Sequence, residues 1–222
     1  MNNTKRFVAI IGIGLAVIMP ISRAFAQSPE QLSAEWWQWA LSIPTSVNPQ
    51  TDLTGEDAVV GQHGSVWFLA GKFGGGTVTR TCSVPEGTAL FFPVINGVGI
   101  NAPGVCGGKH ESVSQVRKDA AMGVDGAGNL SVTLDGVAIG IPPRVRSKVF
   151  SVALPEDNVF DSPPFCDVPA GIYSPAASDG FYVLLGPLSV GGHTLHFHAE
   201  NPAGVLSQDV TYNLTVVPVS LK

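Results

Sequence analysis

Histidines and a carboxylate alternate along residues 192–200, Gly-His-Thr-Leu-His-Phe-His-Ala-Glu. Alternate side chains of a β-strand project from one face, so His196, His198 and Glu200 would lie side by side if this segment is extended. Two imidazoles and a carboxylate are ligands that Zn²⁺ and similar divalent metals accept. The segment is therefore a candidate metal site, which a further ligand such as His63 or His110 would complete. The competing interpretation is a strand whose solvent-facing side is simply polar.

Three cysteines allow one disulfide and leave one thiol free. Cys106 and Cys166 lie in segments rich in Gly and Pro, where the backbone adjusts readily to disulfide geometry. Cys82 lies in a segment with strand character. The sequence therefore predicts a Cys106–Cys166 disulfide and a free Cys82 that is buried and not catalytic.

Three tryptophans occupy four consecutive positions in a segment that predicts a helix over about residues 29–43. Trp36 and Trp39 belong to one apolar face at helical spacing, whereas Trp37 lies on a second side. A helix that is apolar on two sides is either packed within the core or presents aromatic rings to a partner. We expect a packed core helix, and we keep Trp37 as a possible ligand platform, for instance for a sugar ring.

The sequence contains none of the common motifs of hydrolases, phosphate-binding loops, zinc proteases or redox-active cysteine pairs. The Gly-x-Ser-x-Gly, phosphate-loop, His-Glu-x-x-His and Cys-x-x-Cys motifs are all absent. Acid pairs for glycoside hydrolysis are defined by their distance in space, and none of the candidates Glu86, Asp119, Asp161 and Asp179 stands out. We therefore assign no catalytic residue.

The elements that position these residues are mainly strands. Alternating or continuous apolar runs separated by turn signals indicate strands from residue 65 onward, and Asp135-Gly136 predicts a two-residue hairpin turn. The long helix would begin with a capping box formed by Ser28 and Gln31, and Ser112 would cap a shorter helix that reaches about Met122. We expect a mainly β fold, an antiparallel β-sandwich of Ig-like or jelly-roll-like type with an N-terminal helix and one short inserted helix.

The first 26 residues predict export. Lys5 and Arg6 precede an apolar run over residues 7–21, and Ala24-Phe25-Ala26 fits a signal-peptidase site before Gln27. The apolar run is too short to span a bilayer. We expect a secreted or periplasmic protein with residues 1–26 removed, a single domain over residues 27–222, and no membrane span.

Removal of this segment leaves nine basic residues against 17 acidic ones, a formal net charge of −8. A chain of this charge has no general electrostatic affinity for nucleic acid or for an anionic membrane surface. These two classes of partner are therefore not expected.

Five motifs are spread over most of the chain after residue 26: Glu35–Pro44 (EWWQWALSIP), Gly61–Gly71 (GQHGSVWFLAG), Ala89–Pro93 (ALFFP), Asp179–Leu185 (DGFYVLL) and Asp209–Val216 (DVTYNLTV). In this order they resemble the motifs of a family of uncharacterised secreted bacterial proteins. The resemblance implies a secreted bacterial β-protein and carries no activity with it. It also implies a cysteine near Ala58, which this chain lacks, so the role of Cys82 stays open.

The leading hypothesis is a secreted, non-enzymatic β-sandwich that binds an extracellular protein or glycan or associates with the cell envelope, with no cofactor. The alternative is a metal-dependent extracellular enzyme on a β-scaffold, acting for instance on polysaccharide, with Zn²⁺ or a similar metal at His196, His198 and Glu200.

Overall fold

The computed structural model describes residues 27–161, 166–201 and 207–219, so the predicted signal peptide lies outside it. Two α-helices are described, α1 (Pro29–Ser42) and α2 (Val113–Met122). Three short 3₁₀ helices cover Thr45–Val47, Glu56–Val59 and Val105–Gly107. The strands are β1 (Val66–Phe68), β2 (Gly76–Pro85), β3 (Ala89–Ile100), β4 (Gly128–Leu134), β5 (Val137–Ala138), β6 (Arg144–Arg146), β7 (Phe150–Leu154), β8 (Gly171–Leu185), β9 (Gly191–Glu200) and β10 (Ser207–Val217).

The strands form two sheets, as a sandwich requires. Sheet A has the order β1-β3-β8-β6, with β7 also paired to β8, and sheet B has the order β2-β10-β9-β4-β5. The expectation of purely antiparallel sheets is corrected, because β1 pairs with β3 and β2 pairs with β10 in parallel. The chain leaves sheet A after β1, runs through β2 in sheet B and returns as β3. Residue alternation along a strand does not report the direction of its neighbour, so the sequence could not reveal this.

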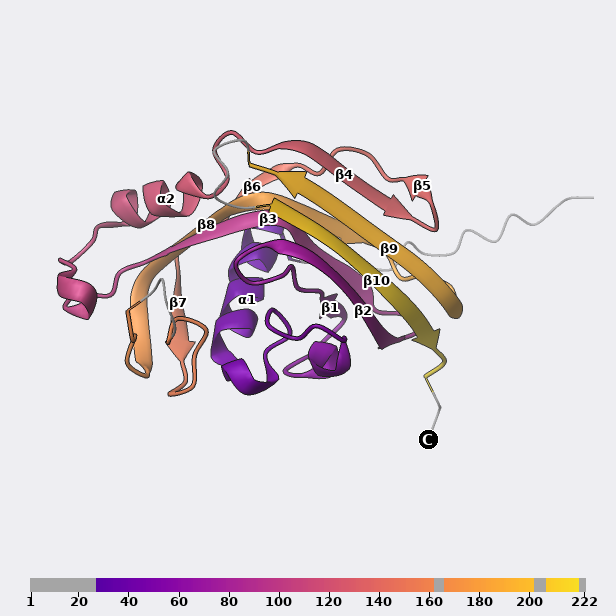
Figure 1. The fold of residues 1–222 in the computed structure, drawn as a ribbon, viewed down its shortest axis with the longest axis horizontal. Coiled ribbons are helices and arrows are strands. Elements are labelled where there is room, and N and C mark those ends of the chain that lie inside the picture. The colour runs from indigo at the N-terminus through magenta and orange to yellow at the C-terminus, as the bar shows by residue number, and fades with distance from the viewer. Residues whose placement is uncertain (1–26, 162–165, 202–206, 220–222) are drawn as a thin grey trace, which may run out of the picture.

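Strand β3 is buried on both faces. Phe91 stacks on Tyr182 of β8 in the cluster that includes α1, and Phe92 stacks on Phe197 of β9 in the cluster between the sheets. The fold therefore has a layer on each side of sheet A, with α1 against one face and sheet B against part of the other (Figure 1). The uninterrupted apolar run at the start of β3 follows from this placement.

Helix α1 packs into the core, as expected. The indole N–H of Trp36 donates to the carbonyl oxygen of Leu69, and that of Trp39 donates to the carbonyl oxygen of Val60, both at 2.9 Å. Trp37 is only 5% exposed and meets Trp36 edge-on, with 5.0 Å between the ring centroids. This burial corrects the platform hypothesis, because the Trp37 ring offers no open face to a ligand.

One of the two predicted helix caps is confirmed by the structure and the other is not. Ser112 caps α2, and its hydroxyl oxygen accepts from the backbone N–H of Gln115 at 3.3 Å. Ser28 precedes α1 but its hydroxyl does not cap the helix, and the side chain of Gln31 donates to Glu35 at 3.0 Å instead of reaching back. The capping box at Ser28 was therefore a wrong prediction.

Helix α2 lies directly on sheet A, on the face opposite α1 and beyond the part that sheet B covers (Figure 1). Gly97 and Gly99 of β3 allow this close approach, because a Cβ atom at either position would collide with the carbonyl oxygen of Ala120 or Val116. The backbone of α2 therefore lies directly against the backbone of β3 at these two glycines.

The cysteines follow the prediction. Cys106 and Cys166 form a disulfide, with 5.9 Å between their Cα atoms. Cys82 is free and buried, and burial raises the pKa of its thiol to about 11. Within the described ranges, no helix has both the length and the apolar character needed to cross a bilayer.

Candidate ligand-binding pocket

Basic residues are concentrated in one region of this acidic chain. Five of the nine that follow residue 26 lie within 32 positions of each other: Arg117, Lys118, Arg144, Arg146 and Lys148. They belong to α2, to β6 and to the short segment between β6 and β7. The fold brings α2 and β6 to the same part of sheet A, so the concentration is spatial as well as sequential.

A buried carboxylate organises the two arginines of β6. The Asp179 side chain is 4% exposed, and it receives Nε and Nη2 of Arg144 at 2.7 and 2.9 Å. Arg146 adds its own Nε at 3.3 Å. The register places β6 beside β8 with Arg146 opposite Asp179, so strand pairing sets this contact. Hydrogen bonds from the guanidinium to Asp179, and secondarily to Asp125, raise the pKa of Arg144 and keep it charged.

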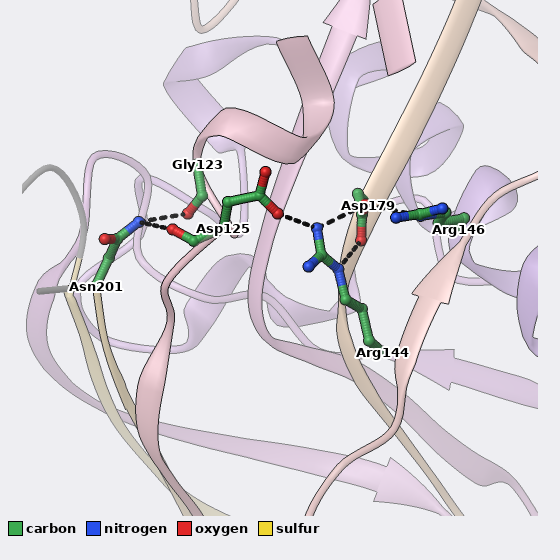
Figure 2. Close-up of polar contacts among 6 residues, drawn as sticks. All are labelled: Gly123, Asp125, Arg144, Arg146, Asp179 and Asn201. Atoms are coloured by element: carbon green, nitrogen blue, oxygen red, sulfur yellow. Dashed lines mark hydrogen bonds and ion pairs between the residues drawn. The ribbon is translucent and has the colours of Figure 1, made fainter. Parts of the chain in front are cut away.

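Figure 2 shows how this ion-pair cluster is tied to sheet B. Arg144 also donates to Asp125, at 2.6 Å, in the loop that follows α2. The amide of Asn201, just after β9, donates to the carbonyl oxygens of Gly123 and Asp125 at 3.2 and 3.5 Å. The loop at the end of α2 is therefore held from both sheets.

A pocket of about 270 Å³ opens between α2 and the edge of sheet A beside this cluster. One face of α2 contributes Ser114, Arg117, Lys118 and Ala121, which follow the i, i+3, i+4, i+7 spacing of a helix. Arg146 of β6 and Ser178 and Asp179 of β8 form the other wall. We call this site the basic pocket, defined by these seven residues.

Each of the three basic side chains of the basic pocket has N–H groups that make no hydrogen bond within the described part of the chain. Arg117 uses one guanidinium nitrogen, which donates to the carbonyl oxygen of Ser147 at 3.2 Å. Arg146 uses its Nε on Asp179, and its side chain is 71% exposed. Lys118 has no hydrogen bond or ion pair with any residue in the described part of the chain. The remaining N–H groups are available to an anion.

Sequence reasoning missed this pocket. Asp179 was one of four acids that did not stand out, and Arg144 lies 35 residues before it, with no periodic pattern to connect them. The strand β6 was not foreseen either, because it has three residues and follows two prolines. The one usable signal was the crowding of basic residues over 117–148.

The predicted metal ligands lie together on the outer face of sheet B, but each of them is engaged in a contact with another side chain. Nε2 of His196 lies 2.7 Å from Asp209 of β10, and Nε2 of His198 lies 3.3 Å from Glu200. Glu200 also accepts from Asn129 at 2.6 Å. In the described ranges, no three His, Cys, Asp or Glu side chains form a group arranged to hold a metal, and this includes His63 and His110. The metal site stays a prediction.

His193 has a different role from its neighbours. Its Nδ1 lies 2.8 Å from Asp135 and its Nε2 lies 2.9 Å from the carbonyl oxygen of Ser189. Asp135 occupies the predicted hairpin turn and has a positive φ of 53°. The hydrogen bond to Asp135, followed by that to Ser189, raises the pKa of His193, and the same imidazole lowers the pKa of Asp135. The pair joins the β4–β5 turn to the start of β9.

Comparison with known proteins does not assign this chain to a family. No protein-family profile and no curated protein matches the chain. A solved structure titled "Solution Structure of Amebosin" matches with a TM-score of 0.20 and 10% identity, over 64% of this chain and 96% of that chain. A structural match with so low a TM-score supports no conclusion about the fold or function of this chain. The resemblance to secreted bacterial proteins stays a prediction.

Proposed function

We propose that this protein is a secreted or periplasmic binding module that holds an anionic ligand in the basic pocket and does not transform it. One observation carries the proposal: three basic side chains line a single pocket in a chain whose formal net charge beyond residue 26 is −8. A local positive site on an acidic protein attracts an anionic ligand, whereas the acidic remainder of the surface repels other acidic molecules.

The walls of the pocket support binding without large rearrangement. Helix α2 is seated on Gly97 and Gly99, and Arg146 is held by the buried Asp179. A site whose walls are fixed before the ligand arrives loses little conformational entropy on binding. Among the expected partners, acidic glycans and acidic peptides both suit this charge.

Export is the second part of the proposal. The signal-peptide pattern of residues 1–26 supports it, and so does the Cys106–Cys166 disulfide, since disulfides persist in oxidising compartments. Mass spectrometry of the protein from the extracytoplasmic fraction should find Gln27 as the first residue. An intact N-terminus in the membrane fraction would contradict export.

Binding is tested with the mature protein and a panel of acidic oligosaccharides, neutral oligosaccharides and acidic peptides, by thermal unfolding. An acidic member at one hundred times its dissociation constant should stabilise the protein by about 2.7 kcal/mol. At the same ligand concentration the Lys118→Met variant should show a clearly smaller shift, about half of this value if its affinity falls tenfold. Recovery of the ligand in chemically altered form would show that the protein is an enzyme.

The metal-dependent enzyme is the second candidate. One observation favours it: Asp209 lies 2.7 Å from His196 and 3.7 Å from His198, so a second carboxylate, and a fourth potential ligand in all, lies near the predicted histidines. Elemental analysis of protein purified without chelators decides the matter. About one bound metal per chain, lost in the His196→Ala variant, would support the enzyme and count against the simple binding module.

A further inference from the structure

We infer that the group bound in the basic pocket is a phosphate monoester, carried at the end of a larger molecule. This inference rests on the proposed binding function and names the chemistry of its ligand. It follows from the charges around the pocket, from the donors that those charges present, and from the size and opening of the pocket.

The charges around the pocket call for a dianion. Three basic side chains and the carboxylate of Asp179 line the pocket, which gives its lining a formal charge of +2. Arg144 and Asp125 form an ion pair outside the lining and add no net charge. The other acids of α2 and the loop before it, Glu111 and Asp119, do not line the pocket. A phosphate monoester carries a charge of about −1.5 to −2 at pH 7. A carboxylate, a sulfate ester or a phosphodiester has one negative charge and would leave a cation uncompensated.

The arrangement of the charges also restricts where the anion lies. Asp179 accepts two hydrogen bonds from Arg144 and one from the Nε of Arg146, so the terminal nitrogens of Arg146 are not used on this carboxylate and can turn toward the pocket. Arg117 and Lys118 approach from α2, across from Arg146. Guanidinium groups match pairs of phosphate oxygens, and an ammonium group adds a compact point charge. Donors from two sides suit an anion with three equivalent terminal oxygens.

Size and polarity point to the end of a larger ligand. At about 270 Å³ the pocket is slightly smaller than the sites that enclose whole drug-sized molecules. Ser114, the second residue of α2, borders it and adds a hydroxyl near the positive end of the helix dipole. A phosphate and the first atoms of its carrier would occupy this space, with the remainder of the carrier in solvent.

The test uses isothermal titration calorimetry on the mature, disulfide-bonded protein at low ionic strength. The probes are glucose 6-phosphate, glucose 6-sulfate and glucuronate, which present different anions on one sugar, and inorganic phosphate, which lacks the carrier. At pH 7.5 glucose 6-phosphate should bind at least about tenfold more tightly than the sulfate ester and the carboxylate, as expected for added charge-assisted hydrogen bonds. Its affinity should fall toward pH 5, because the second pKa of the phosphate is about 6. Inorganic phosphate should also bind, and the difference between it and glucose 6-phosphate measures the contribution of the carrier.

Matched variants locate the site. Lys118→Met and Arg146→Met should each weaken glucose 6-phosphate binding by about tenfold or more. Lys109→Met changes the net charge equally but lies outside the pocket, so its affinity should stay within about twofold of the parent protein. Lys118 is exposed and makes no ion pair with the residues that the structure describes, so this variant keeps the test valid even if Arg146→Met loses stability.

The outcomes separate this inference from the binding function itself. Equal affinity for all three sugar anions, with loss in Lys118→Met, would overturn the phosphate assignment and leave an anion-binding module. Equal weakening in Lys118→Met and Lys109→Met would overturn the site. Binding of a neutral oligosaccharide alone would overturn both the phosphate assignment and the anionic class of ligand.

Discussion

At the scale of single residues, Asp179 is the carboxylate that the rest of the basic pocket depends on. Removal of Arg144 would leave it buried with one weaker partner, and an unpaired buried charge is costly. We expect Arg144→Ala to lower the free energy of unfolding by about 2–4 kcal/mol, at or below the usual range because Arg144 itself is partly exposed. Urea unfolding measures this.

The matched control is Arg146→Ala, which removes the longer and more exposed contact to the same carboxylate. It should cost about 1 kcal/mol or less. Similar losses in the two variants would show that Asp179 does not depend specifically on the bidentate pair.

The His193–Asp135 pair gives stability a defined dependence on pH. The folded state raises the pKa of His193, so its contribution is complete below the unfolded value of about 6.5 and is lost as the pH rises through the folded value. The folded state lowers the pKa of Asp135, so its contribution is present above about 3.9 and is lost as the pH falls through the folded value. Their joint effect is therefore greatest between about pH 4 and 6.5.

The Asp135→Asn variant isolates this effect, because asparagine tolerates the positive φ of the turn. The difference in unfolding free energy between the parent protein and this variant should be largest near pH 5 and smaller at pH 9. A difference that grows from pH 5 to pH 9 would contradict the assignment of the charged pair.

At the scale of elements, α1 is a part of the core and not an appendage. Trp39 packs against Trp36 and Phe68 and donates to Val60, so Trp39→Ala should cost about 3–5 kcal/mol, as other core aromatic deletions do. Gln38→Ala, at an exposed position of the same helix, should cost less than about 1 kcal/mol. Chemical denaturation of both variants tests this, and a fully stable Trp39→Ala protein would show that the helix is not part of the core.

Helix α2 depends on the missing side chain at Gly99. An added methyl group would meet the carbonyl oxygen of Val116, so Gly99→Ala should cost about 1–3 kcal/mol and should displace the helix that carries Arg117 and Lys118. Thermal unfolding and ligand affinity should therefore fall together. Gly123→Ala is the control, because its φ is −75° and a methyl group there meets nothing within 4 Å. It should leave both quantities nearly unchanged.

The sequence predicted the elements whose pattern is local. Helix α1, the Ser112 cap, the Asp135-Gly136 turn and strands β9 and β10 all have a periodicity or a turn signal that lies within a few residues. Strand β6 gave no such signal, and the parallel partner of β2 lies more than 120 residues away. The pocket depends on the pairing of β6 with β8 and on the seating of α2 on sheet A, which have no local sequence pattern. This explains why the His193–Glu200 segment drew attention and the Arg144–Asp179 pair did not.

At the scale of the whole molecule, the Cys106–Cys166 disulfide joins the segment after β3 to the segment before β8, across 60 positions. By the chain-entropy account, closure of a loop of this length stabilises a fold by up to about 4 kcal/mol. We expect Cys166→Ala to lose about 2–4 kcal/mol. Denaturation with and without reductant checks this: the parent protein should lose stability on reduction, and the variant should not respond.

The pairing of β2 with β10 has a consequence for the order of events in biosynthesis. These strands run in parallel from Gly76 beside Gln208 to Pro85 beside Val217, so one edge of sheet B pairs two segments that lie more than 120 residues apart in the sequence. Contacts of such high contact order form slowly, because a long loop must close before they are made. The chain cannot complete this sheet until its C-terminal strand has left the ribosome. Sheet B would therefore remain incomplete during synthesis, and an incompletely folded chain would suit the proposed export, because a narrow channel threads unfolded chain.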